Sequence, residues 1–247
     1  MRTTALAYVC PVGAMDTVEI QRVVAIEDDN WWYRERRAIV ARELRRLGTP
    51  GRAADIGAAG GGNTRVLLEH GWEAIAIDAS PAAVELARLR GIDAYHGDAC
   101  YLPLSTGDFD FVMALDVLQH ITDDRTACAE LARVLRPGGT ALISVPCDLA
   151  LWSAHDVALG HVRRYSRESL TEVIEGAGLV LDRMWSWNVL LRPVAKWRRH
   201  RSSPPDMERL HPLVNAGLRA IAMLERVLPL GGLPGVTLFA RAHRPEL

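Results

Sequence analysis

The sequence has 247 residues, of which 49% are hydrophobic and 24% are charged. This composition is typical of an ordinary globular protein, and the length suits one substantial core with appendages better than two separate domains. The formal net charge of -1 gives no overall field that would favour nucleic acid or an anionic membrane surface, so any basic patch must be local.

Cysteine usage and the apolar segments indicate a cytoplasmic protein. Residues 1–14 contain a short apolar run broken by Pro11 and make a poor signal peptide. The late apolar stretch at residues 213–230 is interrupted by charges, so we interpret it as an amphipathic helix and expect no membrane insertion. No CxxC or metal-ligand spacing links the cysteines, which we interpret as reduced thiols: Cys10, Cys100, Cys128 and Cys147.

The first part of the chain predicts helices and then an alternating pattern. Residues 16–47 have apolar positions at helical spacing, which predicts two helices with Trp31, Trp32 and Tyr33 between them. From residue 52 to 146, strand-like runs alternate with helical segments, as in a parallel sheet covered by helices. The predicted strands lie at residues 53–56, 74–77, 94–96, 111–115 and 140–145.

Turn residues set the boundaries of the intervening helices. Ser80 and Pro81 supply an N-cap and a first-turn proline for a helix over residues 82–90, which Gly91 ends. The Arg-Pro-Gly-Gly sequence at residues 136–139 stops a helix over 125–135 and turns the chain into the next strand.

The last hundred residues are less regular. An irregular stretch runs to Tyr165, followed by a helix over residues 167–177 and a strand near 179–185. A polar, basic break at residues 198–206 predicts a mobile loop inside a helical insertion. A final strand is predicted at residues 236–240.

A glycine-rich turn is the most informative segment. It occupies residues 54–62 at a strand end and precedes a helical segment at 63–70. Such a turn lets a cofactor approach the backbone, and the following helix presents free N–H groups. Asp78 ends the next strand, where a carboxylate can accept hydrogen bonds from both hydroxyls of a ribose, and Asp98 follows the third strand. Either carboxylate alone fits a surface turn, but together at successive strand ends they predict a nucleotide-type site.

These residues form an ordered series that resembles the class I S-adenosylmethionine-dependent methyltransferases over roughly residues 50–185. Asp55-Ile56-Gly57 with Gly61 resembles their first motif, and Asp78 resembles the acidic ribose ligand. Gly97-Asp98-Ala99 resembles the adenine-side motif, and residues 135–139 resemble the turn before the fifth strand. The central glycine usual in the first motif is Ala59 here.

The resemblance implies S-adenosyl-L-methionine as the cofactor. Asp55 and Gly57 would line its methionine and sulfonium end, Asp98 with Ala99 its adenine, and Asp116 would close the pocket after the fourth strand. The complete set of residues expected to bind the cofactor is Asp55, Gly57, Ala59, Gly61, Asp78, Ala79, Asp98, Ala99 and Asp116.

The resemblance also implies an α/β fold, with a Rossmann-like, seven-stranded, mostly parallel sheet and helices on both faces. The seventh strand would be antiparallel and would follow a helical insertion. We expect a single methyltransferase domain over residues 1–247. It would comprise an N-terminal helical cap (1–50), a cofactor-binding core (51–147) and a segment with the substrate-side loop, insertion and final strands (148–247).

No metal is expected. Some quinone-biosynthesis relatives are proposed to bind a metal through an acidic residue beside the histidine that corresponds to His120. Gln119 stands at that acidic position here.

The flanking segments resemble the substrate-side elements of a bacterial branch of the family that acts on small molecules. The residues expected to contact the acceptor are Trp31, Trp32, Tyr33, Trp152, Arg164, Tyr165 and Trp185. The aromatic run at 31–33 also fits a packing plug between a helix and the sheet. For removal of a proton from the acceptor, histidine is suitable, and we rank His155 first, His161 second and His120 third. A role in holding the loop through hydrogen bonds is the alternative for these histidines.

A basic cluster interleaved with Trp197 fits a solvated helix end. Contact with an anionic acceptor or with a membrane surface is the alternative. The cluster comprises Arg192, Lys196, Arg198, Arg199 and Arg201.

The predicted function is transfer of a methyl group by in-line displacement to a small or medium organic acceptor in small-molecule biosynthesis, without nucleic acid as partner. A homodimer is left open. One rival is an NAD-dependent oxidoreductase, because Gly57, Ala59 and Gly62 nearly satisfy the dinucleotide fingerprint, but no second phosphate-binding turn follows the fourth strand. The other is a protein that binds S-adenosylmethionine without catalysis.

Overall fold

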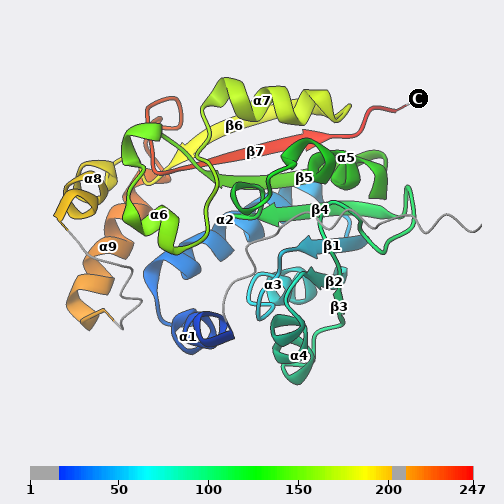
Figure 1. Ribbon diagram of the computed structural model, residues 1–247, viewed down its shortest axis with the longest axis horizontal. Coiled ribbons are helices and arrows are strands. Elements are labelled where there is room, and N and C mark those ends of the chain that lie inside the picture. The colour runs from blue at the N-terminus through cyan, green and yellow to red at the C-terminus, as the bar shows by residue number, and fades with distance from the viewer. Residues whose placement is uncertain (1–16, 202–209, 247) are drawn as a thin grey trace, which may run out of the picture.

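A seven-stranded sheet forms the centre of the computed structural model, which describes residues 17–201 and 210–246 (Figure 1). The strand order is β3-β2-β1-β4-β5-β7-β6, and β7 is antiparallel to both of its neighbours while the other pairs are parallel. The seven-stranded, mostly parallel fold with an antiparallel last strand is therefore confirmed. The strands are β1 (Arg52–Ile56), β2 (Glu73–Asp78), β3 (Ala94–His96), β4 (Phe109–Leu115), β5 (Leu135–Pro146), β6 (Val180–Trp187) and β7 (Thr237–His243).

Helices cover both faces of the sheet because its strands are apolar on both sides. In β4, Phe111 and Met113 pack with helices α2 and α3, whereas Val112 and Ala114 pack with α5 and α7. This alternation with period two buries one set of side chains under each helical layer. The covering helices are α2 (Trp31–Leu47), α3 (Thr64–Glu69) and α4 (Pro81–Leu89) on one face, and α5 (Asp124–Val134) and α7 (Arg167–Gly176) on the other.

The remaining helices gather at the end of the molecule where the parallel strands finish, at the left of Figure 1. They include α1 (Thr17–Ile26), α6 (Ala154–Ala158), α8 (Arg192–Arg201), α9 (Pro212–Glu225) and the short turns η1 (Leu118–His120) and η2 (Leu149–Leu151). Ligands of open parallel sheets bind at the carboxyl ends of the strands. The cap helices therefore surround the edge where a site is expected.

Two predicted boundaries were wrong. Trp31, Trp32 and Tyr33 begin α2 instead of linking two helices, because the Asn30 side chain accepts a hydrogen bond from the Trp32 N–H at 2.9 Å and caps the helix there. The Arg-Pro-Gly-Gly segment at 136–139 lies inside β5, and the pairing with β4 shifts register between Phe109 and Phe111.

The helical insertion between β6 and β7 is confirmed in its described parts. The predicted basic break falls partly on α8, which continues to Arg201, and its remainder at residues 202–206 lies outside the described residues. The amphipathic stretch near 213–230 forms α9 and the turns after it. Within the described ranges, the helices are too short or too polar to cross a membrane.

Candidate active site

The glycine-rich turn joins β1 to α3 and lies against the end of β2. The N–H of Gly57 donates to the Ile77 carbonyl at 2.8 Å, which ties the start of the turn to the neighbouring strand. Gly57 has a φ of +69°, and a Cβ there would lie 2.4 Å from Cγ2 of Val117. Only glycine fits this position, because a larger residue meets both the steric overlap and the left-handed backbone.

The predicted carboxylates lie at successive strand ends along one edge of the sheet. Asp55 is the penultimate residue of β1, Asp78 ends β2, and Asp98 follows β3. Asp78 accepts hydrogen bonds from the N–H groups of Ala59 and Ser80, both at 2.8 Å. Each carboxylate oxygen retains a further lone pair, so Asp78 can still accept two hydroxyl groups.

The neighbouring backbone is held in place as well. Asp98 accepts a hydrogen bond from the Cys100 N–H at 2.8 Å, and Ala99 is buried beside it. The Ala79 carbonyl lies 3.0 Å from Nε2 of His96. The turns that follow β2 and β3 are therefore fixed next to each other by side chains at the ends of these strands.

Arg36 lies at this edge of the sheet, although it was predicted only as part of a substrate-side segment and not among the cofactor-binding residues. Its guanidinium pairs with Asp116 after β4 and lies over the Trp32 ring, 4.0 Å from the centroid. Burial lowers the pKa of Arg36 to about 10, so it stays cationic at neutral pH, and its buried Nε has no hydrogen-bond partner. Ser144 donates to the other oxygen of Asp116 at 3.2 Å. The helical spacing of Trp32 and Arg36 was the signal that could have indicated this cation.

Backbone strain is concentrated at the same edge. In the described chain, the non-glycine residues with positive φ are Ala59, Asp116, Asp148 and Asn188. They follow β1, β4, β5 and β6, which all run in the same direction, so each lies just beyond the carboxyl end of a strand. Such conformations cost of order 1–3 kcal/mol each and cluster at functional sites. Ala59, with a φ of +48°, adopts a left-handed backbone that glycine reaches more easily.

Asp55 is almost completely buried, and Thr64 donates a hydrogen bond to it at 2.7 Å. Burial raises the pKa of Asp55 to about 7, although the Thr64 hydrogen bond and the Arg36 charge act in the opposite direction. The folded chain therefore binds one proton more than the unfolded chain between the usual value of 3.8 and about 7. Stability consequently falls as the pH rises through this window.

We expect Asp55→Asn to remove that pH dependence from the cofactor-free protein. Relative to the wild type, its free energy of unfolding should rise by about 1 kcal/mol or more at neutral to alkaline pH, and the difference should vanish below about pH 4. Urea unfolding across the pH range measures this effect. The exposed Asp93→Asn serves as control. Parallel pH profiles for Asp55→Asn and the wild type would contradict the buried ionisation.

Asp156 organises the loop after β5. Its carboxylate is completely buried and accepts from the Arg164 Nε–H at 2.8 Å, and it lies 3.0 Å from Nδ1 of His161. The Ser153 N–H also donates to it at 3.0 Å. Burial alone would raise the pKa of Asp156, but the His161 hydrogen bond and the Arg164 charge hold it below its usual value. His161 is therefore fixed by a buried carboxylate, an arrangement that orients one ring nitrogen.

The three candidate histidines have different surroundings. His161 packs edge-on against His120, with 4.9 Å between ring centroids. Burial and the neighbouring His161 lower the pKa of His120 to about 4, and its buried Nδ1 has no hydrogen-bond partner. His155 is the second residue of the short helix α6, and burial lowers its pKa as well. Of the three, His161 is the one whose ring is held by a carboxylate in the described chain.

Two residues expected at the acceptor are committed to the protein interior. Arg164 is fully buried, binds Asp156 and donates to the Cys147 carbonyl at 2.7 Å. Tyr165 is 2% exposed and donates to Asp124 at 2.7 Å. These contacts occupy the polar groups of Arg164 and Tyr165 inside the protein, so we no longer expect either side chain to contact the acceptor.

Arg164→Ala tests this revision through stability. Removing the guanidinium leaves the buried Asp156 without its closest cation, so the free energy of unfolding should fall by about 3 kcal/mol. Denaturant unfolding measures the loss, with the exposed Arg125→Ala as a control. An unchanged free energy of unfolding would mean that Arg164 is not needed for stability and is again a candidate for contact with the acceptor.

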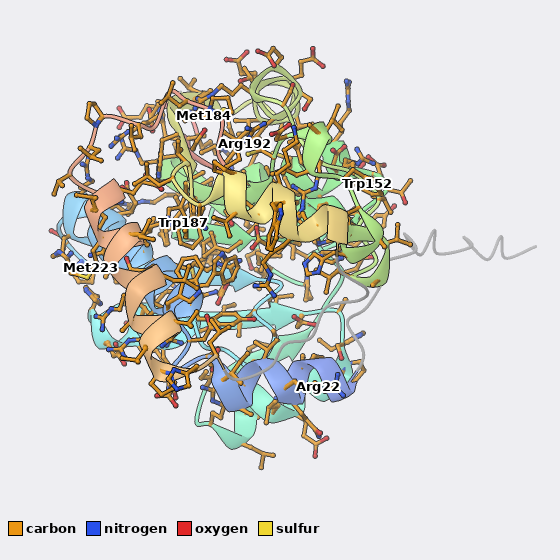
Figure 2. All side chains as sticks on the ribbon, turned by 90° about the vertical axis from the view of Figure 1, so that its left-hand side faces the viewer. Arg22, Trp152, Met184, Trp187, Arg192 and Met223 are labelled. Atoms are coloured by element: carbon orange, nitrogen blue, oxygen red, sulfur yellow. The ribbon has the colours of Figure 1, made fainter. Side chains whose placement is uncertain are left out.

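Trp32 and Tyr33 lie beside Arg36, whereas Trp185 and Trp187 belong to the core. Trp32 lies 5.0 Å from Tyr33 and 5.5 Å from Trp187, measured between ring centroids. Trp185 is instead stacked on Phe239 within the core, because it packs under α2 on the sheet face. Trp152 follows η2 and is partly exposed at the end of the molecule that Figure 2 views, where Trp187 is also labelled. Trp31 donates its backbone N–H to Asn215 of α9 at 2.8 Å.

Two further features bear on ligands. Within the described ranges, no group of three or more His, Cys, Asp or Glu residues is arranged to hold a metal ion. A cavity of about 600 Å³ lies between the α1–α2 connection and α9, and its lining includes Asn30, Arg34 and Met223. The residues that line this cavity do not include the carboxylates at the strand ends, so it is distinct from the carboxylate edge.

Known proteins match the same region of the chain. Residues 54–143 match a family model described as a methyltransferase domain. A Mycolicibacterium smegmatis protein whose description is "Probable S-adenosylmethionine-dependent methyltransferase" is 28% identical over 165 residues, which is 65% of this chain and 63% of the relative. The chain thus aligns with less than two thirds of that relative. Over this region the chain is therefore similar to S-adenosylmethionine-dependent methyltransferases.

Solved structures share the fold across nearly the whole chain. A chain from the complex of the Haloferax volcanii Trm112 methyltransferase activator with a methyltransferase has a TM-score of 0.63 at 22% identity, covering 93% of this chain and 96% of that one. Phosphoethanolamine N-methyltransferase 2 of Haemonchus contortus, solved with S-adenosyl-L-methionine, has a TM-score of 0.62 at 21% identity, covering 94% of this chain and 58% of that one. At these identities the likeness shows the fold.

Proposed function

We propose that this chain transfers the methyl group of S-adenosyl-L-methionine to a small or medium organic acceptor. The observation that carries the proposal is the convergence of Asp55, Asp78, Asp98 and Asp116 on the carboxyl edge of the sheet, next to a turn in which only glycine fits at position 57. This edge is where open α/β sheets bind nucleotide-like ligands.

The residues at this edge fit the parts of the cofactor. Asp78 has free lone pairs for two ribose hydroxyls, and the fixed turn at Asp98 and Ala99 would hold the adenine. Arg36 is a buried cation with an unused N–H, which suits the carboxylate of the methionine part. The turn residues Gly57, Ala59 and Gly61, together with Ala79, would contact the cofactor through their backbone.

The protein has two tasks in such a transfer. When bound, the cofactor supplies a methyl group on a positively charged sulfur that is a good leaving group, so the chain mainly aligns the acceptor for in-line displacement. The second task is to remove a proton from the acceptor where necessary. We assign it to His161, because Asp156 holds its Nδ1 and leaves Nε2 for the acceptor.

The acceptor we propose has an apolar or aromatic part. Trp32 and Tyr33, backed by the buried Trp187, form an aromatic wall beside Arg36, and such walls favour flat, apolar ligands. Two of the four described side chains in the basic cluster are tied to the protein, Arg192 to Asp148 and Arg199 to the Leu151 carbonyl. The cluster therefore offers too few free cations to follow a nucleic-acid backbone.

Calorimetry with S-adenosylmethionine, its demethylated product and NAD tests the class of reaction. We expect binding of the first two and no binding of NAD. A screen of metabolites for a mass gain of one methyl group then identifies the acceptor. Binding of NAD would favour an oxidoreductase, and cofactor binding without turnover on any acceptor would favour a non-catalytic protein.

A cytoplasmic location is part of the proposal. Its support is the state of the described cysteines, since Cys100, Cys128 and Cys147 are buried and form no disulfide with one another.

A further inference from the structure

Helix α9 turns its polar residues toward the protein. Asn215 donates to the Asp29 carbonyl at 2.9 Å and accepts from the Trp31 N–H. Glu225 is buried and accepts from the Leu190 N–H at 3.1 Å, and Arg219 lies 3.6 Å from the carboxylate of Glu35. These contacts fix which side of α9 faces inward.

The outward side of α9 is apolar. Leu213 is 77% exposed, Val214 is 52% exposed and Leu224 is 53% exposed. With Ile221, they recur at the spacing that places residues on one stripe of a helix. Val227 and Leu228 extend the exposed apolar surface beyond the helix end. An amphipathic helix normally buries such a stripe, and a contiguous exposed one marks an interaction surface.

The exposed side of α8 adds an aromatic residue and positive charge. Trp197 is 56% exposed, and Lys196 and Arg198 beside it are also exposed. The sequence of α8 contains no Asp or Glu, and the single acidic residue of α9 is the buried Glu225. The described surface of these two helices therefore combines apolar side chains with cations.

Both helices lie at the same end of the molecule. They are at the left of Figure 1 and in front in Figure 2, beyond the carboxyl ends of the parallel strands. Arg192 and Arg199 of α8 bind the loop after β5, which also carries His161. The exposed face is therefore next to the proposed site.

We propose that α8 and α9 form a docking face for an anionic membrane surface. The apolar stripe of α9 would enter the boundary between headgroups and acyl chains, while Lys196 and Arg198 would reach lipid phosphates. A second copy of the chain would offer the same apolar and basic groups, without an exposed carboxylate on these helices to pair with the cations. An anionic bilayer offers acyl chains to the apolar stripe of α9 and phosphates to the cations of α8.

Docking in this orientation would turn the end of the molecule that carries the proposed site toward the lipid. An apolar acceptor dissolved in the membrane would then reach the site without crossing water. Docking itself does not depend on methyl transfer, so it can be tested separately from the proposed reaction.

Co-sedimentation of the full chain with vesicles tests the proposal. We expect binding to vesicles that contain phosphatidylglycerol, little binding to phosphatidylcholine alone, and weaker binding at high salt. Lys196→Glu with Arg198→Glu, and separately Leu213→Ser with Leu224→Ser, should each weaken the partitioning by about tenfold or more. Leu89→Ser removes an exposed leucine of α4, outside this face, and should change nothing.

Three results would overturn the proposal. They are equal binding to both kinds of vesicle, no binding to either, or partitioning that both double variants leave unchanged. Light scattering adds a further check: a dimer that Leu213→Ser with Leu224→Ser converts to monomer, without vesicle binding by the wild type, would assign the stripe to a second copy. Calorimetry with S-adenosylmethionine shows whether the variants stay folded and whether the cofactor site works independently of docking.

Discussion

Asp78→Ala should weaken the binding of S-adenosylmethionine by about a hundredfold, which corresponds to about 3 kcal/mol. A carboxylate at the end of β2 would hold two ribose hydroxyls through charge-assisted hydrogen bonds, and alanine loses both. The N–H groups of Ala59 and Ser80 donate to the Asp78 carboxylate, and the substitution leaves both without this partner. Part of the loss would therefore come from a loosened turn.

Asp78→Asn separates these two effects. Asparagine keeps one acceptor for the backbone but loses the negative charge and one acceptor oxygen, so its affinity should lie between those of the wild type and Asp78→Ala. Calorimetry measures the three affinities, and thermal unfolding reports whether the variants stay folded. Asp93→Ala is the matched control. Asp93 is exposed and precedes the amino end of β3, away from the carboxyl ends of the strands where Asp78 lies. Unchanged affinity in both Asp78 variants would show that the ribose does not bind there.

His161→Ala should slow methyl transfer by about a hundredfold in a single turnover, the usual contribution of a general base. Asp156 fixes the ring of His161, whereas His155 has no such partner among its described hydrogen bonds. We therefore expect His155→Ala to slow the step by less than about threefold. This ranking reverses the one predicted from the sequence.

The measurement uses the acceptor identified by the metabolite screen and saturating cofactor. Cofactor affinity is checked separately, so that a binding defect is not mistaken for a slower step. Asp156→Asn should change the pH profile of the rate, because it alters the partner of the histidine ring. A loss below tenfold for His161→Ala, in a folded protein, would make these histidines part of the loop architecture alone.

The sheet and its turns were largely predictable because their signals are local. The apolar runs of β1, β2 and β4, the Ser80-Pro81 helix start and the glycine-rich turn all depend on residues close in sequence. The ends of parallel strands share one edge, so the order of Asp55, Asp78 and Asp98 along the chain also predicted their proximity. Boundaries were less accurate where capping decided them, as at Asn30 before Trp31.

The site beyond those carboxylates depends on long-range contacts. Arg36 meets Asp116 only because α2 packs across the sheet, and the two residues are eighty positions apart in the chain. Composition and periodicity likewise could not tell that Arg164 and Tyr165 would be buried, because both are polar residues in an irregular loop. Their burial follows from partners, Asp156 and Asp124, that satisfy their hydrogen bonds.

Local patterning of the chain was thus sufficient for the α/β class of fold and for the shared edge of the carboxylates, whereas the antiparallel last strand was predicted from the resemblance to the family. Tertiary packing decided which cation faces Asp116, which histidine is held by a carboxylate, and which side of α9 points outward. The physical reason is that hydrophobic period and turn chemistry act over a few residues, whereas burial and charge pairing depend on what the rest of the chain brings alongside. The outward apolar stripe of α9 shows this difference clearly, because its period predicts a helix and only its packing shows that the stripe is exposed.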